Sequence, residues 1–384
     1  MTMTDVFGRE ACDLGEFRAL VEVEGERPPH ARHVRQRVPV YDAASLAGLV
    51  GDRTSRRVIR DELAGVLGTG AGIFVLAGAF EHAVVDRATA VFEAMIAQQH
   101  EEGRAVGDHY AKPGANDRVW NAIEKLALRD PDVFVDYYAN DMVALAAESW
   151  LGPGYQISSQ INVVNPGGEA QQPHRDFHLG FMTDDEAADF PAHAHRLSPM
   201  LTLQGAVAHC DMPVESGPTM YLPYSQRYEL GYLAWRRPDF VAYFDEHRTQ
   251  LPVHKGDVVV FNPALFHAAG SNVTSDVKRM ANLLQISSPM GRAMETMDRI
   301  TMSRTVYPVL RQRRRGMSER AVANVVVAAA DGYAFPTNLD NDPPLDGLTP
   351  PSHAAIMTDA LERDLEPAEF DGLVAALVER RRSA

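Results

Sequence analysis

The sequence predicts a mainly β core with helices before and after it in the chain. Short β-like runs separated by turn residues fill the region from about 155 to 288, and strands in such a series are typical of a sandwich or barrel. Amphipathic helical patterns precede this region, and helical and loop character returns after it. We therefore expect one β core with helical decorations on its N- and C-terminal sides.

The chain before the β core predicts an arm followed by supporting helices. Residues 1–54 are charged and irregular, which predicts an extended N-terminal arm or a surface cover. The apolar run 72–78 is bounded by glycines and predicts a strand, whereas the polar stretch 107–117 predicts a loop. Helical patterns occupy three further segments. These segments are 55–67, 81–102 and 131–151.

The β core and the chain after it complete the expected organisation. Five runs of β-forming residues are separated by turn residues. They are Gln156–Val164, Met200–Ala208, Thr219–Leu222, Asp257–Phe261 and Arg279–Ser287. The expected parts are the arm (1–54), a central domain (55–290, with helical support over 55–154 and the β core over 155–290) and a C-terminal helical extension (291–384) packed on the core.

Composition limits the classes of partner. The formal net charge of −15 argues against nucleic-acid binding and against adhesion to anionic membranes, since both need clustered Lys and Arg. The longest apolar run, 321–330, is far shorter than the roughly 20 residues that span a bilayer. Cys12 and Cys210 are too few for a disulfide framework, and no signal-peptide pattern is seen. We expect a cytoplasmic protein that acts on a small molecule; whether it forms a homo-oligomer stays open.

The chemistry of the chain is concentrated in a His-x-Asp pair and a distant histidine. His174 and Asp176 are two positions apart, just after the turn-like Pro166-Gly167-Gly168, and on a strand this spacing directs both side chains to one face. His267 follows 91 residues after Asp176. Two His and one carboxylate form the facial triad of non-heme Fe(II) oxygenases, which leaves coordination positions open for other ligands.

A basic residue near the distal histidine adds to this pattern. A 2-oxo acid co-substrate carries a distal carboxylate, which needs a buried cation, and Arg binds carboxylates bidentately. Arg279 lies twelve positions after His267, across a hairpin-like turn, and Lys278 lies eleven positions after it. A shift of one residue along a strand moves a side chain to the other face. We favour Arg279 and keep Lys278 as the alternative.

Three blocks in this order resemble the phytanoyl-CoA dioxygenase family, a branch of the Fe(II)/2-oxoglutarate oxygenases. The first runs from Ile161-Asn162 through Pro166-Gly167 to His174-Arg175-Asp176. The second is Glu215-Ser216-Gly217-Pro218-Thr219-Met220-Tyr221-Leu222-Pro223-Tyr224-Ser225. The third runs from Lys255-Gly256-Asp257 through His267 to Arg279. The family's basic residue usually stands eleven positions after the distal His, which is the position of Lys278 here.

The resemblance implies a fold, a reaction and roles for named residues. The fold is a double-stranded β-helix, a cupin-like jelly roll. His174, Asp176 and His267 would bind Fe(II), Arg279 would hold the C5 carboxylate of 2-oxoglutarate, and Asn162 would contact this co-substrate. The reaction would use O2 to hydroxylate an unactivated C–H of a small-molecule or natural-product substrate, with formation of succinate and CO2. Desaturation and cyclisation are alternatives, and the substrate is not identified.

Other residues are candidates for contact with the substrate. Tyr110, Lys112 and Trp120 belong to a region that covers the substrate in the resembling family, although a surface connection is nearly as good an explanation. For His178 we favour an ordinary polar residue near the site mouth over a substrate contact. For His209 we favour a core histidine or one that supports the site from behind over a metal ligand.

Two other functions stay open. One is a jelly-roll metal-dependent dioxygenase or isomerase that does not use 2-oxoglutarate; Arg279 and Lys278 argue against it. The other is a catalytically silent binding protein on the same fold, against which the intact set of His174, Asp176 and His267 argues.

Overall fold

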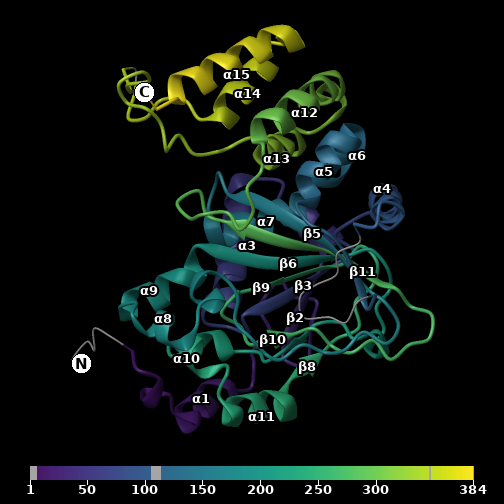
Figure 1. Ribbon diagram of the computed structural model, residues 1–384, viewed down its shortest axis with the longest axis vertical. Coiled ribbons are helices and arrows are strands. Elements are labelled where there is room, and N and C mark those ends of the chain that lie inside the picture. The colour runs from purple at the N-terminus through teal and green to yellow at the C-terminus, as the bar shows by residue number, and fades with distance from the viewer. Residues whose placement is uncertain (1–6, 105–113, 346, 384) are drawn as a thin grey trace.

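The centre of the protein is a pair of β-sheets with helices at both ends (Figure 1). The computed structural model describes residues 7–104, 114–345 and 347–383. Within these residues the larger sheet has eight strands in the order β1-β2-β3-β9-β6-β11-β5-β4. Its strands are β1 (His33–Arg35), β2 (Val38–Asp42), β3 (Ile73–Ala77), β9 (Val258–Phe261), β6 (Thr202–Ala208), β11 (Arg279–Ser287), β5 (Gln156–Val164) and β4 (Asn116–Val119).

A smaller sheet completes the core. In the described chain it has three short strands in the order β10-β7-β8. They are β10 (His267–Ala268), β7 (Met220–Tyr221) and β8 (Thr249–Gln250). Side chains of both sheets line one cavity, so the sheets face each other as the two walls of a jelly roll. The expected double-stranded β-helix is confirmed.

Strand β11 shows how alternation builds the cavity wall. It pairs antiparallel with β5 on one side and with β6 on the other, and Ala281 lies opposite Asn162 and Ala208. Because successive side chains of a strand point to opposite faces, Arg279, Ala281, Leu283 and Gln285 line the cavity. The intervening Met280, Leu284 and Ile286 join the hydrophobic core on the other face of the sheet.

The N-terminal segment departs from the expected extended arm. It holds η1 (Arg9–Ala11), α1 (Leu14–Val21), β1, β2 and α2 (Ala43–Leu49). Strand β2 pairs in parallel with β3, and its Val38 and Tyr41 are fully buried. This β signal was hidden because both strands are short and because Pro39, the second residue of β2, interrupts the alternation that a strand prediction needs. Residues 33–42 therefore belong to the large sheet.

Two expectations in the helical region also need correction. The stretch 107–117, expected as a loop, ends in β4, which pairs with β5; residues 105–113 lie outside the described ones. The single helix expected over 131–151 is two helices. The first ends at Tyr138, and Asn140 caps the second, because its side-chain oxygen accepts hydrogen bonds from the backbone N–H groups of Met142 and Val143. The helices of this region are α3 (Arg53–Gly68), α4 (His82–Glu101), α5 (Ala122–Arg129), α6 (Pro131–Tyr138) and α7 (Asp141–Leu151).

Short helices lie between the strands of the core where the sequence predicted none. They connect β5, β6 and the smaller sheet. They are α8 (Asp184–Ala188), α9 (Ala192–Leu197), α10 (Gly231–Ala234) and α11 (Pro238–His247). Four to six residues are too few to show helical periodicity, which explains why α8, α9 and α10 were not predicted.

The C-terminal residues form a helical group at one end of the molecule, opposite α1 and α11 (Figure 1). The group consists of α12 (Arg299–Arg313), α13 (Glu319–Ala329), α14 (His353–Glu362) and α15 (Pro367–Arg381). Helix α12 packs against α5 and α6, and α13 contacts β5. In the described residues, no helix is long and apolar enough to cross a membrane.

Candidate metal centre and its cavity

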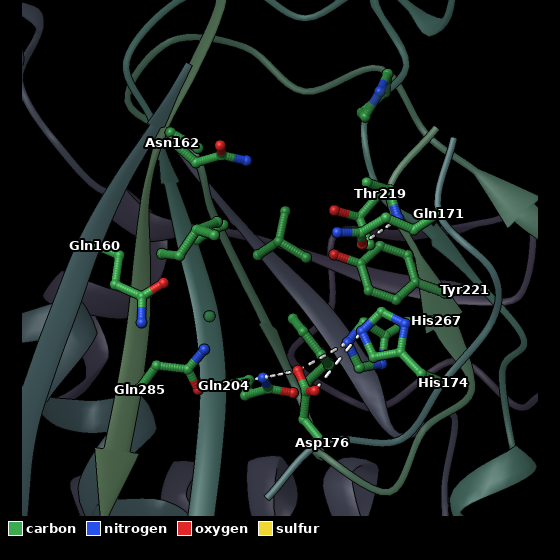
Figure 2. A pocket seen from close by; sticks show the side chains of 18 of the residues that line it. Gln160, Asn162, Gln171, His174, Asp176, Gln204, Thr219, Tyr221, His267 and Gln285 are labelled. Carbon is green, nitrogen blue, oxygen red and sulfur yellow. Dashed lines mark hydrogen bonds and ion pairs between the residues drawn. The ribbon is translucent and has the colours of Figure 1, made fainter. Parts of the chain in front are cut away.

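The three predicted ligands lie side by side at one end of the smaller sheet. His174 and His267 form an antiparallel β-bridge: the N–H of His174 donates to the carbonyl of His267 (2.9 Å), and the N–H of His267 donates back (3.2 Å). Asp176 follows in a loop, where its N–H donates to the carbonyl of Pro263 (3.1 Å). The predicted strand through His174 and Asp176 is thus a single bridge followed by a loop, yet all three side chains converge (Figure 2).

The ligand atoms are spaced as around one ion. Asp176 Oδ1 lies 3.7 Å from His174 Nε2, and Asp176 Oδ2 lies 3.4 Å from His267 Nε2. The candidate ligand atoms all lie within 4.8 Å of one another. Two atoms each about 2.1 Å from an ion and at right angles are about 3 Å apart, so a modest contraction would complete the set.

The backbone orients both imidazoles for this role. Nδ1 of His174 lies 3.0 Å from the carbonyl oxygen of Gln172, and Nδ1 of His267 lies 2.8 Å from that of Leu265. A carbonyl can only accept, so each Nδ1 carries a proton and each Nε2 is left to face Asp176 and any bound metal. Two imidazoles and one carboxylate on one side are the donor set that suits a non-heme iron ion. The residues present therefore fit such a metal.

The carboxylate of Asp176 is held in its ionised form. Burial by itself would raise its pKa, but the imidazoles of His174 and His267 and the amide of Gln204 together hold the pKa below its ordinary value. Gln204 Nε2 donates to Asp176 Oδ2 at 2.5 Å and to Gln285 Oε1 at 3.2 Å. An ionised carboxylate with a fixed orientation is what a metal ligand requires.

Arg175, between the two ligands in sequence, anchors their loop from behind. Its fully buried guanidinium donates to the carbonyls of Ser225 (2.6 Å) and Tyr228 (2.9 Å). No carboxylate among the described residues pairs with it. The loop then turns sharply, because Phe177 and His178 both have positive φ (62° and 41°). Such conformations cost of order 1–3 kcal/mol each and cluster at functional sites.

The centre opens into a cavity of about 510 Å³ between the two sheets. Arg279 lines this cavity and is 6 % exposed, whereas Lys278 lies on the protein surface. Arg279 Nη1 reaches the carbonyl oxygens of Ser216 (3.3 Å) and Gly270 (3.4 Å). Desolvation by burial lowers its pKa to about 10, so it stays charged at neutral pH. The buried cation near His267 is therefore Arg279.

The remaining candidates divide into two groups. Asn162 and Trp120 line the cavity. His178 contacts Ser198 (3.0 Å), and His209 is buried between Thr89 (2.8 Å) and Tyr137 (2.9 Å). Neither histidine lines the cavity, so neither is placed to touch a substrate there. Tyr110 and Lys112 lie outside the described residues.

Sequence reasoning named Asn162 but missed the three other members of a group of amide side chains in the cavity wall. They lie on β5, β6 and β11 and point inward (Figure 2). Gln160 and Asn162 are two residues apart on β5, and this alternation of polar residues on a strand was the signal that could have shown them. The group is Gln160, Asn162, Gln204 and Gln285.

Comparison with known families decides the membership of the chain. The phytanoyl-CoA dioxygenase (PhyH) family model matches residues 69–281. The chain belongs to the PhyH family. The resemblance drawn from the sequence is confirmed, and with it an enzyme of the Fe(II)/2-oxoglutarate-dependent superfamily.

No curated protein sequence matches the chain significantly. Several solved structures are similar. One is the non-heme α-ketoglutarate-dependent epimerase SnoN from nogalamycin biosynthesis, with 18 % identity and a TM-score of 0.42 over 61 % of this chain and 82 % of SnoN. AviO1 from Streptomyces viridochromogenes has 18 % identity and a TM-score of 0.42 over 63 % and 98 %. HygX from Streptomyces hygroscopicus, with nickel and 2-oxoglutarate bound, has 15 % identity and a TM-score of 0.38 over 59 % and 87 %.

Proposed function

We propose that this PhyH-family enzyme is a cytoplasmic Fe(II)- and 2-oxoglutarate-dependent dioxygenase. It would hydroxylate an unactivated C–H of a small-molecule or natural-product substrate and form succinate and CO2. One observation carries the proposal: the convergent His174, Asp176 and His267 share a cavity with a buried arginine, Arg279, that no carboxylate of the described chain neutralises.

The protein would hold the metal from one side only. His174 and His267 offer Nε2 lone pairs, and Asp176 offers a carboxylate, so three positions would remain for ligands that enter from the cavity. Ferrous iron with 2-oxoglutarate and O2 would supply the oxidising chemistry. The polypeptide's part is to fix the ligands, to orient the co-substrate and to exclude water.

Arg279 is the proposed partner of the co-substrate's distal carboxylate. Within the described residues this buried guanidinium has two long carbonyl contacts and no carboxylate partner, and leaving a buried charge without a partner costs several kcal/mol. A dicarboxylic acid bound to the metal at one end would supply the missing anion at the other. Asn162, whose buried Oδ1 has no partner among the described residues, would contact the same co-substrate.

The walls around these groups exclude water. The apolar side chains of Ile73, Val75, Val259 and Phe261 line the cavity, and all four are at least 90 % buried. Such walls strengthen electrostatic interactions inside the cavity and shield reactive species from water. A jelly-roll enzyme that does not use 2-oxoglutarate would have no use for Arg279, and a silent binding protein would not need two imidazoles with oriented Nε2 atoms.

The test is a direct measurement on the full-length protein. Anaerobic addition of Fe(II) and 2-oxoglutarate should produce a weak visible charge-transfer band, and oxygen should then yield succinate. The same additions to Asp176→Ala supply the control and should produce neither. The absence of both band and succinate in the wild type would defeat the proposal. Product analysis with an identified substrate would separate hydroxylation from desaturation or cyclisation.

A further inference from the structure

Two glutamines of the cavity wall are orientated by their neighbours. Arg118 Nη1 donates to Gln160 Oε1 at 2.8 Å. A guanidinium can only donate, so the oxygen of Gln160 must face Arg118, and its Nε2 must point the other way. Gln160 is 2 % exposed and lines the cavity. Its nitrogen is directed toward Met294, another residue of the cavity wall.

The second glutamine is fixed by a relay that begins at the metal centre. The carboxylate of Asp176 can only accept, so Gln204 must present its Nε2 to it, and the same nitrogen donates to Gln285 Oε1 at 3.2 Å. The oxygen of Gln285 is thereby used, and its Nε2 points away from Gln204. Figure 2 shows the amide nitrogens of Gln160 and Gln285 turned toward each other.

These two amide nitrogens lack adequate acceptors. Within the described chain, Gln160 Nε2 has only the sulfur of Met294 at 3.8 Å, a weak acceptor, and no acceptor is found for Gln285 Nε2. Both side chains are at least nine-tenths buried. Buried amides without partners cost about 1–3 kcal/mol, so the pair is suited to a ligand that accepts hydrogen bonds.

The distal carboxylate of the co-substrate does not meet this need. Arg279 and Gln285 point into the cavity from the same strand, six residues apart, which corresponds to about 20 Å between their backbone positions. A carboxylate held by Arg279 therefore leaves Gln285 available to another acceptor.

We propose that Gln160 and Gln285 form a subsite that binds a carbonyl-type oxygen of the substrate. A carbonyl oxygen has two lone pairs, which match two convergent N–H donors. The nearby cavity walls include the apolar side chains of Trp120, Phe181 and Trp235. Asp176 is the one carboxylate among the described residues that line the cavity. The substrate class is therefore a largely apolar molecule without a cationic group that carries a ketone, ester or amide oxygen; this assignment deepens the proposed function and rests on it.

The experiment compares two probes of the same shape. The full-length protein, with Fe(II) and 2-oxoglutarate and without oxygen, is titrated with 1-indanone and with indane, and the dissociation constants are measured by ligand-observed NMR. We expect 1-indanone to bind about tenfold more tightly, as two net hydrogen bonds imply. Equal affinities, or no binding of either probe, would overturn the subsite. Cationic 1-aminoindane should bind more weakly than 1-indanone, and tighter binding of the amine would equally overturn it.

Matched variants test whether Gln160 and Gln285 cause the preference for 1-indanone. Gln285→Met and Gln160→Met keep the side-chain length and remove the donor, and each should shrink the preference for 1-indanone. Gln156→Met, on the same strand as Gln160 but outside the cavity, should retain it. Circular dichroism verifies folding. If the charge-transfer band forms but the probe preference is missing, the subsite fails and the dioxygenase stands. If the preference is present but the band does not form, the dioxygenase proposal fails and the subsite stands.

Discussion

The ligand set makes a prediction at the scale of single residues. Asp176→Ala and His267→Ala should each lower turnover by more than about 100-fold, because each removes a ligand whose neighbours alone would not retain the metal. Circular dichroism should show a largely intact fold. His193→Ala is the matched control, since His193 is exposed on α9 and lies outside the cavity. Full activity in either ligand variant would show that the assignment is wrong.

The neighbouring pair Lys278 and Arg279 allows a matched comparison. Arg279→Gln should weaken 2-oxoglutarate binding by about 30-fold or more, since truncating one partner of a buried charge pair costs roughly 2–5 kcal/mol. Lys278→Gln, at the exposed neighbouring position, should leave the affinity unchanged. Titration of the charge-transfer band measures both. The opposite pattern would assign the co-substrate carboxylate to Lys278.

Gly231 is required by the buried Arg175. A Cβ at Gly231 would lie 1.8 Å from Arg175 Cζ. Gly231→Ala should therefore destabilise the fold by about 1–3 kcal/mol and loosen the loop that carries His174 and Asp176. Gly48→Ala, on α2 with nothing within 4 Å, should be neutral or slightly stabilising. Thermal unfolding with and without Fe(II) measures both effects, and equal stability of the two variants would contradict the contact.

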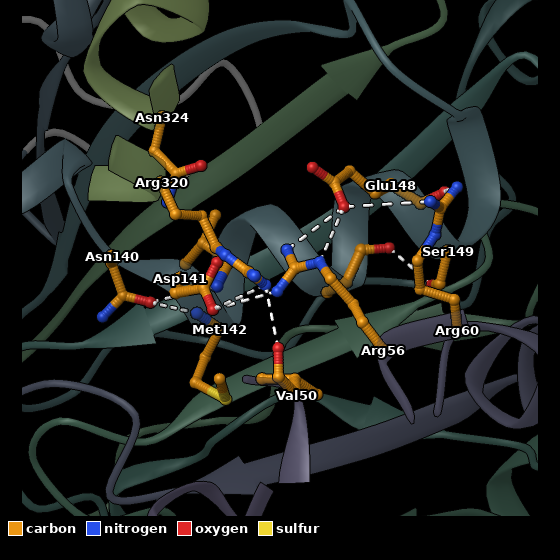
Figure 3. Close-up of polar contacts among 12 residues, drawn as sticks. Val50, Arg56, Arg60, Asn140, Asp141, Met142, Glu148, Ser149, Arg320 and Asn324 are labelled. Atoms are coloured by element: carbon orange, nitrogen blue, oxygen red, sulfur yellow. Dashed lines mark hydrogen bonds and ion pairs between the residues drawn. The ribbon is translucent and has the colours of Figure 1, made fainter. Parts of the chain in front are cut away.

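At the scale of elements, a charge network joins helices that are distant in sequence (Figure 3). Arg56 of α3 is 8 % exposed and contacts Asp141 (2.9 Å) and Glu148 (3.1 Å) of α7. Arg320 of α13 donates to the carbonyl of Val50, just after α2, and lies 3.7 Å from Asp141. Asp141 of α7 thus links α13, one of the C-terminal helices, to α3 and α7, which precede the β core in the chain.

This network predicts an unequal response to charge removal. Asp141→Asn should destabilise the fold by about 1–3 kcal/mol, because it leaves the nearly buried Arg56 with one partner fewer. Glu379→Gln breaks the pair with Arg382, in which both side chains are 69 % exposed, and should change stability by less than about 1 kcal/mol. Chemical denaturation measures both. A negligible effect of Asp141→Asn would mean that the network does not stabilise the junction.

At the scale of the whole molecule, two buried histidines make stability depend on pH. Desolvation by burial lowers the pKa of His209 to about 3 and that of His353 to about 4, from the ordinary 6.5. The unfolded chain therefore binds protons below about pH 6.5 that the folded chain does not bind. Stability is fully present above that pH and falls as the pH drops toward 4, by up to about 1.4 kcal/mol per pH unit for each histidine.

Variants test this dependence. The midpoint of urea denaturation should fall between pH 6.5 and 4.5 in the wild type, and His353→Gln, which keeps a hydrogen-bonding group near Ser303, should flatten the fall. The exposed His193→Gln supplies the control. An unchanged slope in His353→Gln would show that this histidine does not couple folding to protons.

The sequence by itself determined the class of core, the iron-type ligand set and the strand that carries Arg279. Strand β11 has the predicted bounds, Arg279–Ser287, because its alternation is long and regular. Periodicity and residue chemistry are local, so such features can be read without coordinates. For the same reason β2 and α8 were not predicted. Strand β2 is short and contains Pro39, and α8 has only five residues, so neither shows a clear local pattern.

Only the tertiary structure decided which side chains meet. It placed His267 beside His174 across a single β-bridge and put Arg279 rather than Lys278 in the cavity. It also joined Asp176, Gln204 and Gln285 into one hydrogen-bonded relay. The physical reason is that register between strands far apart in sequence depends on turn lengths and on packing across the whole sheet, and neither is encoded in a local pattern.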